Sequence, residues 1–309
     1  MSERSIPWWG DMMDKMRVCV FPDRADWTVQ RSLLLGALVC AVLFMVCYFV
    51  LVGTSWGHQV DDYAYFGHEA LSRKVIRLDS DMLDLVTKAA LLVAAAVLLL
   101  IAAVRRCIFV GVIAVMGFGG AVVGAELLKD TLPWRELVPD DGLFEKDFQT
   151  GTYPSGHATI GTALALSLLL VSPPRWRPWL AVAGGCVSSI FSTGVLFAGW
   201  HRPSDALGAV AWSGFCMNLA AALAVKLKGR PTPAIAHPGR AVLCSVGSGI
   251  VVAAVAWMSA AGAAPKYPNS DLPFFVLTGL IIAGAFSLTA WYGWQLRAID
   301  WSAEQASIA

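Results

Sequence analysis

A short turn in the middle of the chain combines the residue types that bind and protonate a phosphate group. It reads Pro154-Ser155-Gly156-His157 and lies just before the apolar run that starts at Ile160. Ser155 can cap the free N–H groups of a helix that begins here, and proline is tolerated at such a start. Gly156 lets the backbone approach a ligand closely, and the positive end of the helix dipole attracts an anion. With His157 as a proton donor, the turn predicts a phosphate site, although the same residues could simply begin a helix.

A second histidine is followed by an acid at helical spacing. His201 and Asp205 lie one turn apart if a helix begins near Pro203. A carboxylate bonded to one imidazole nitrogen fixes the tautomer and leaves the other nitrogen free to attack a substrate. Asp205 could also be only an acid in a first helical turn, favoured by the dipole. That alternative does not explain why His201 stands at the same depth as His157.

Three cations accompany these motifs and could hold the oxygens of a phosphate. Lys129 ends the apolar run before the turn, Arg135 follows it, and Arg202 is adjacent to His201. Arg202 could equally be an arginine at the membrane interface. Glu126 stands one helical turn from Lys129, and we interpret a contact between the two as structural.

The composition is that of a membrane protein. Of the 309 residues, 57% are hydrophobic and only 15% are charged, which exceeds the apolar share of an ordinary soluble domain. The net charge is +1, so we expect no nucleic-acid partner. None of the cysteines forms a C-x-x-C pair, which argues against a zinc site or a disulfide framework.

Eight runs approach the roughly 20 apolar residues that a spanning helix needs. We therefore predict an all-α, polytopic transmembrane helical bundle, with an N-terminal segment over 1–31 and a first span that serves as an uncleaved anchor. A six-span core follows over 32–225, then a linker over 226–240, two additional spans within 241–294 and a tail over 295–309. The predicted spans are Ser32–Thr54, Met82–Val104, Cys107–Leu128, Ser155–Val171, Leu180–Phe197, Ala206–Val225, Ala241–Ala261 and Phe274–Trp294.

The lysines and arginines near the span ends predict the orientation. The connections that hold Arg105-Arg106, Arg175 and Arg177 are short and basic, as are the N-terminal segment and the linker. These connections and both termini should therefore be cytoplasmic, in a protein of the cell membrane. His157 and His201 should then face the extracytoplasmic side.

The first outward connection contains residue types that can bind a metal. They are His58, Asp61, Asp62 and His68, and their spacing matches no metal site that we can name. We interpret this connection as a solvated loop.

The motifs resemble those of the type 2 phosphatidic acid phosphatase (PAP2) superfamily, integral membrane phosphatases that share a core with vanadium haloperoxidases. The signature of that family is K-x6-R-P, then P-S-G-H, then S-R-x5-H-x3-D. Here the second part is intact as Pro154-Ser155-Gly156-His157, and the third is partly intact as His201-x3-Asp205. The resemblance covers about 32 to 225 and leaves the last two spans unexplained.

Two parts of the signature depart from the family pattern. Arg135 follows Lys129 one place early, and Glu136-Leu137 occupy the Arg-Pro positions. Gly194-Val195 stand where the family has Ser-Arg, and valine cannot replace an arginine that grips phosphate with a planar fork. Arg202 could supply the missing charge from another direction.

The resemblance implies hydrolysis of a lipid phosphomonoester or diphosphate, of the phosphatidate or polyprenyl diphosphate type, without a metal or cofactor. His201 would attack phosphorus and form a phosphohistidine, Asp205 would orient it, and His157 would protonate the leaving oxygen and later activate water. The implied phosphate-binding residues are Lys129, Arg135, Ser155, Gly156 and Arg202.

Two other functions stay open for the same fold. The phosphohistidine could pass its phosphate to another alcohol, which would make the protein a phosphotransferase. The altered first and third motifs could also indicate a non-catalytic protein that binds lipids or assists assembly.

Overall fold

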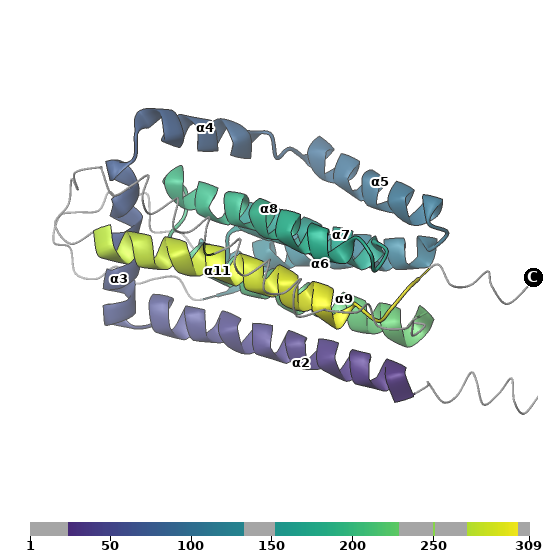
Figure 1. Ribbon diagram of the computed structural model, residues 1–309. Coiled ribbons are helices and arrows are strands. Elements are labelled where there is room, and N and C mark those ends of the chain that lie inside the picture. Colours follow the sequence, from purple (N-terminus) through teal and green to yellow (C-terminus); the bar gives the residue numbers. More distant parts are fainter. Residues whose placement is uncertain (1–23, 133–151, 229–249, 251–270, 302–309) are drawn as a thin grey trace, which may run out of the picture.

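The computed structural model describes residues 24–132, 152–228, 250 and 271–301, and within these ranges every regular element is a helix (Figure 1). The all-α prediction is therefore confirmed. The helices run α2 (Arg24–Cys47) with a π-helical extension η1 (Tyr48–Val52), α3 (Ser55–Phe66), a 3-10 turn η2 (Gly67–Ala70), α4 (Arg73–Asp84), α5 (Lys88–Val104), α6 (Ile108–Thr131), α7 (Gly156–Val171), α8 (Arg177–Phe197), α9 (Pro203–Lys228) and α11 (Asp271–Gln295).

Five of the described helices are long and apolar enough to cross a membrane. They correspond to the predicted first, third, fifth, sixth and eighth spans, and they confirm a polytopic bundle. The fourth predicted span is the shorter α7, with 16 residues. The seventh, Ala241–Ala261, lies outside the described residues.

The second predicted span is not one straight helix. The run Met82–Val104 is broken between α4 and α5, whose axes differ by 66°. The break has a local cause, because Thr87 is extended and its hydroxyl accepts the N–H of Ala90 at 3.2 Å, which starts α5 anew. α4 also carries the exposed charges Arg73 and Arg77, which suit a helix that lies along an interface better than one that spans.

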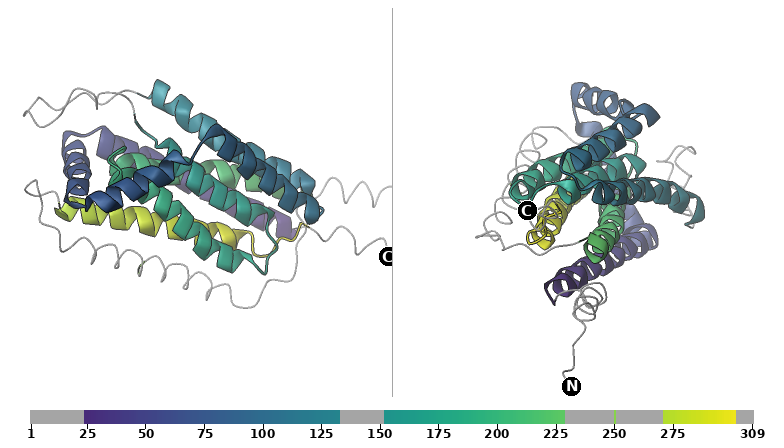
Figure 2. Two further views of the ribbon diagram at one scale, coloured as in Figure 1. Left: turned by 90° about the horizontal axis from the view of Figure 1, so that it is seen from above. Right: turned by 90° about the vertical axis from the view of Figure 1, so that its right-hand side faces the viewer.

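α7 occupies the centre of the bundle and packs against α6, α8 and α9. Its sequence is largely apolar, with apolar residues on every side, as expected for a helix surrounded by others, and residues such as Leu166, Leu169 and Leu170 are fully buried. Glycines let the neighbours come close: a Cβ on Gly185 would lie 2.5 Å from the ring of Phe286 on α11. The right-hand view of Figure 2 looks along the bundle from one end and shows the helices gathered side by side around its centre.

The two ends of the bundle differ in character. The beginning of α2 and the end of α11 meet at one end, where the Gln295 side chain donates to the carbonyl of Ser32 at 2.7 Å (Figure 1). At this end the buried Arg177 donates to the carbonyl of Ile299 at 2.6 Å, and Trp301 donates to that of Leu170 at 2.6 Å. The opposite end holds α3 and the α8–α9 connection (Figure 1), and these two segments are joined there by contacts of Asp61 and Asp62 with Ser204 and Arg202.

Candidate active site

The connection between α8 and α9 is short and tightly folded. Gly199 follows the end of α8 with a φ of +70°, a conformation in which glycine carries no steric penalty. The next two N–H groups, those of Trp200 and His201, both donate to the carbonyl of Val195, at 3.0 and 3.1 Å. The backbone therefore turns back over the last turn of α8, and these hydrogen bonds fix the position of the His201 backbone.

His201 and Asp205 are in contact, as their spacing predicted. Nδ1 of His201 lies 3.1 Å from Oδ2 of Asp205, whose carboxylate is fully buried. The same oxygen accepts the backbone N–H of Arg202 at 3.2 Å, so Asp205 reaches back to the start of its own helix as in a capping box. The contact engages Nδ1 and leaves Nε2 as the nitrogen that is available to a substrate.

The Pro154–His157 turn lies directly against this pair. Ser155 is the N-cap of α7, its hydroxyl accepting the N–H of Ala158 at 3.5 Å, and α7 begins at Gly156. The N–H of Ser155 donates to the carbonyl of Asp205 at 3.0 Å. A backbone hydrogen bond thus joins two motifs that are 50 residues apart in sequence.

His157 follows in the first turn of α7 and packs edge-on against Trp200, with 5.4 Å between the ring centroids. Because Trp200 directly precedes His201, His157 contacts the same α8–α9 connection that contains His201. The Tyr153–Pro154 peptide bond is cis, and the hydroxyl of Tyr153 donates to the carbonyl of Phe44 on α2 at 2.7 Å. The hydrogen bond from Tyr153 to Phe44 anchors the turn to α2.

Lys129 reaches the start of α7 from the end of α6. Its ammonium lies 2.9 Å from Oε1 of Glu126, so the expected contact of these two side chains is present. A Cβ on Gly156 would lie 2.5 Å from that oxygen and 3.3 Å from the ammonium, and only glycine allows so close an approach. Arg135, the other cation predicted on this side, lies outside the described residues.

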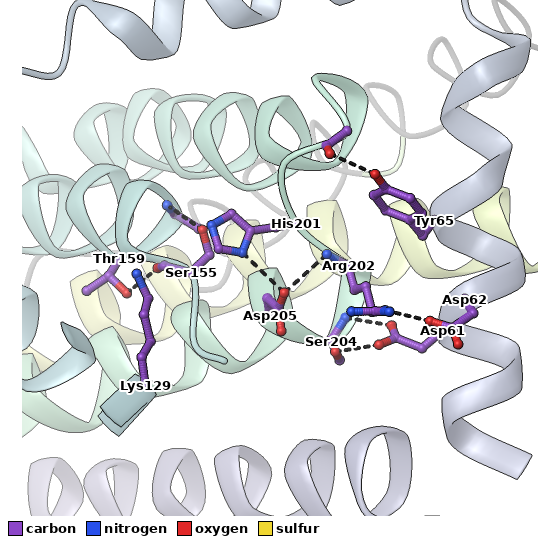
Figure 3. A network of polar contacts seen from close by, with 12 residues as sticks. Asp61, Asp62, Tyr65, Lys129, Ser155, Thr159, His201, Arg202, Ser204 and Asp205 are labelled. Carbon is purple, nitrogen blue, oxygen red and sulfur yellow. Dashed lines mark hydrogen bonds and ion pairs between the residues drawn. The ribbon is translucent and has the colours of Figure 1, made fainter. Parts of the chain in front are cut away.

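Arg202 points away from Lys129 and Ser155, toward α3 (Figure 3). Its side chain is 2% exposed, and its Nε donates to Oδ1 of Asp62 at 2.5 Å. The other oxygen of Asp62 lies 3.1 Å from Nε2 of His58. Asp61 accepts the N–H of Ser204 at 2.9 Å and its hydroxyl at 2.6 Å.

The interpretation of this segment as a solvated loop is wrong. His58, Asp61 and Asp62 belong to the helix α3 and are all buried. Burial by itself would raise the pKa of Asp62, but the hydrogen bond with His58 and the charge of Arg202 together hold that pKa below its ordinary value. The sequence did contain a signal, since residues 58, 61, 62 and 65 recur at the spacing of one helix face.

The place of the missing family arginine is part of the apolar core. Val195 is fully buried and clusters with Leu83 of α4 and Phe274 of α11. Arg202 does not fill this place, because its guanidinium is bound to Asp62. Among the described residues, no group of three or more His, Cys, Asp or Glu side chains is arranged to hold a metal ion.

Taken together, the described residues place an imidazole with a buried carboxylate partner, a second imidazole and a lysine at one helix N-terminus. Such a set can bind a phosphate, attack it and protonate a leaving group. Residues 107–228 match the family model of the PAP2 superfamily, and this match contains Lys129, His157, His201 and Asp205. Comparison with curated proteins and with solved structures finds no match.

Proposed function

We propose that the chain is a membrane phosphatase of the PAP2 superfamily, whose family model matches residues 107–228, and that it hydrolyses a lipid phosphomonoester or diphosphate. The long apolar helices and the family together make it an integral membrane protein of a phosphatase-type family. The observation that carries the proposal is the direct contact between the two motifs. Asp205 orients His201 through its carboxylate and holds Ser155 through its carbonyl.

In the proposed reaction, His201 is the nucleophile. Its Nε2 attacks phosphorus while the bond from phosphorus to the leaving oxygen breaks, which gives a phosphohistidine. Asp205 keeps the proton on Nδ1 and stabilises the positive charge that the ring acquires. The buried carboxylate suits this role because it is already aligned before a substrate binds.

His157 is the proposed acid and base. It gives a proton to the leaving oxygen, and it later takes a proton from the water that attacks the phosphohistidine, which releases phosphate and restores both histidines. Its position beside Trp200, next to the nucleophile, supports this assignment.

The proposed phosphate-binding residues are Lys129, Ser155, Gly156 and Arg135. Lys129 supplies charge, and the N-terminus of α7 supplies backbone N–H groups that point toward an anion. We do not assign the guanidinium of Arg202 to the phosphate, because it is occupied by Asp62. The substrate is proposed to be a phosphatidate or polyprenyl diphosphate type of lipid, whose apolar part lies between the helices, with the site on the outer face of the membrane.

Purified protein in detergent micelles should release inorganic phosphate from such lipids, and His201→Ala should reduce this release to background. A phosphoprotein should be trapped by acid quenching of the wild type and be missing from His201→Ala. Transfer of radiolabelled phosphate to an alcohol, in place of its release as inorganic phosphate, would indicate the phosphotransferase reaction. A variant His201→Ala that is as active as the wild type would refute the assignment of the nucleophile.

A non-catalytic function is the second candidate, and one observation favours it. Val195 fills the place of the family's arginine with an apolar side chain, and Arg202 is bound elsewhere. Failure to turn over a broad panel of lipid phosphates, together with binding of the same lipids, would select this function. Steady turnover by the wild type would reject it.

A further inference from the structure

We propose that α3 is a positioning helix for the nucleophile, acting through three contacts that hold the α8–α9 connection on both sides of His201. We name these contacts the α3 latch: Tyr65 with Gly199, Asp62 with Arg202, and Asp61 with Ser204 (Figure 3). The inference rests on the proposed function, since a nucleophile is what the latch would position.

The latch fixes the backbone before and after the histidine. Tyr65 donates its hydroxyl to the carbonyl of Gly199 at 2.9 Å, two residues before His201. After the histidine, Asp61 accepts the backbone N–H of Ser204 at 2.9 Å, and Asp62 binds the side chain of Arg202. Because His201 lies between two anchored residues, a shift of α3 would carry the imidazole with it.

Asp61 completes the start of α9. The first N–H groups of a helix have no partner within the helix, and Asp61 accepts that of Ser204 together with its hydroxyl. A carboxylate at a helix N-terminus is also favoured by the dipole. Because Asp61 of α3 bonds the N–H of Ser204, the carboxylate of Asp205 can be shared between the N–H of Arg202 and the ring of His201.

Asp62 keeps the charge of Arg202 in place. A buried guanidinium without a carboxylate is strongly unfavourable, and this one is 2% exposed. His58 binds the second oxygen of Asp62 and so orients the carboxylate toward Arg202. The ion pair therefore turns the arginine next to the nucleophile into a structural anchor and directs its charge away from the phosphate-binding residues.

The α3 side of the latch lies outside the part of the chain that matches the family. The match starts at residue 107, whereas α3 covers Ser55–Phe66. The contacts span 134 to 143 residues of sequence. The geometry of this active site is therefore set in part by a helix that the family motifs do not contain.

The test compares Asp62→Asn and Tyr65→Phe with Asp81→Asn, which removes an exposed carboxylate from α4. Turnover is measured on phosphatidate in micelles and on the soluble substrate p-nitrophenyl phosphate, per folded protein. Because a misplacement of about 1 Å can cost about 100-fold in rate, Asp62→Asn should lower kcat by about 10- to 100-fold while KM changes less than about threefold. Tyr65→Phe should act in the same direction but more weakly, and Asp81→Asn should match the wild type.

A double-mutant cycle separates positioning from folding. If the latch acts through Asp205 and His201, then Asp62→Asn should have little further effect on kcat once Asp205→Asn is present. Full additivity of the two losses would overturn the inference, and so would a kcat of Asp62→Asn within twofold of the wild type.

Amide hydrogen exchange makes the test independent of turnover. Peptides that cover residues 199–205 should exchange at least about tenfold faster in Asp62→Asn and Tyr65→Phe than in Asp81→Asn. Unchanged exchange in both latch variants would overturn the inference even if the wild type had no activity. An inactive wild type would count against the proposed function alone.

Discussion

Replacing Gly156 by alanine tests how closely α6 and α7 approach at the residues that we propose to bind phosphate. The new Cβ would lie 2.5 Å from Oε1 of Glu126, whereas ordinary contacts begin at 3.4 Å. The Glu126 side chain is 59% exposed, so it can retreat by the roughly 1 Å that is needed. Its partner Lys129 would then lose its position at the start of α7.

The expected result is a loss of activity without a loss of stability. Since a displacement of about 1 Å can reduce a rate by about 100-fold, kcat/KM should fall by about 10- to 100-fold, or about 1.4 to 2.7 kcal/mol. The free energy of unfolding should change by no more than about 1 kcal/mol, because alanine itself favours the helix. Phosphate release and thermal unfolding of purified Gly156→Ala measure the two quantities.

Two further variants make this reasoning refutable. Gly120→Ala is the matched control, since a Cβ there would meet no atom within 4 Å, and it should be fully active. In a Glu126→Ala background the 2.5 Å clash disappears and only the 3.3 Å contact with the flexible Lys129 ammonium remains, so adding Gly156→Ala should change kcat/KM by less than about threefold. Wild-type activity of Gly156→Ala, or an equal loss with and without Glu126, would show that the close approach does not position Lys129.

Three other expectations follow from the contacts of this end of the bundle. Lys129→Met should raise the KM for a phosphate substrate about tenfold or more and change kcat less, measured by steady-state kinetics, because in the proposed function the ammonium contributes charge for binding. Tyr153→Phe should lower the free energy of unfolding by about 1 kcal/mol in denaturant titrations, because it removes the hydrogen bond to Phe44. The contacts of Asp62 lower the pKa of its carboxyl, so they stabilise the fold fully at pH values above 3.8, the ordinary pKa of the side chain. This stabilisation is lost as the pH falls below that value. Asp62→Asn should therefore flatten the dependence of stability on pH below about 4, as followed by acid unfolding.

The parts of the site that depend on local spacing could be predicted from the sequence. The contact of His201 with Asp205 and that of Lys129 with Glu126 both join residues within one helical turn. The helical bundle itself follows from the length of the apolar runs. The broken span is an exception, because the hydrophobicity of the run does not predict that Thr87 caps a new helix.

The contribution of α3 could not be predicted in the same way. Asp61 and Asp62 are polar residues that become buried only because partners 140 or more positions later neutralise or bond them. Because their spacing matches no metal site, the sequence alone favours a solvated loop. The orientation of Arg202 depended on the same partners, so its role could not be decided from its position beside His201.

The cluster around Val195 has a consequence for where the chain can be divided. Phe274 and Ile281 of α11 lie in the same buried cluster as Val195 and Ala158, so residues beyond the family segment form part of the core that supports the α8–α9 connection. A fragment limited to 107–228 would lack both this part of the core and α3. Any transfer of the motifs into another scaffold must therefore include substitutes for α3 and α11, which contain none of the motif residues.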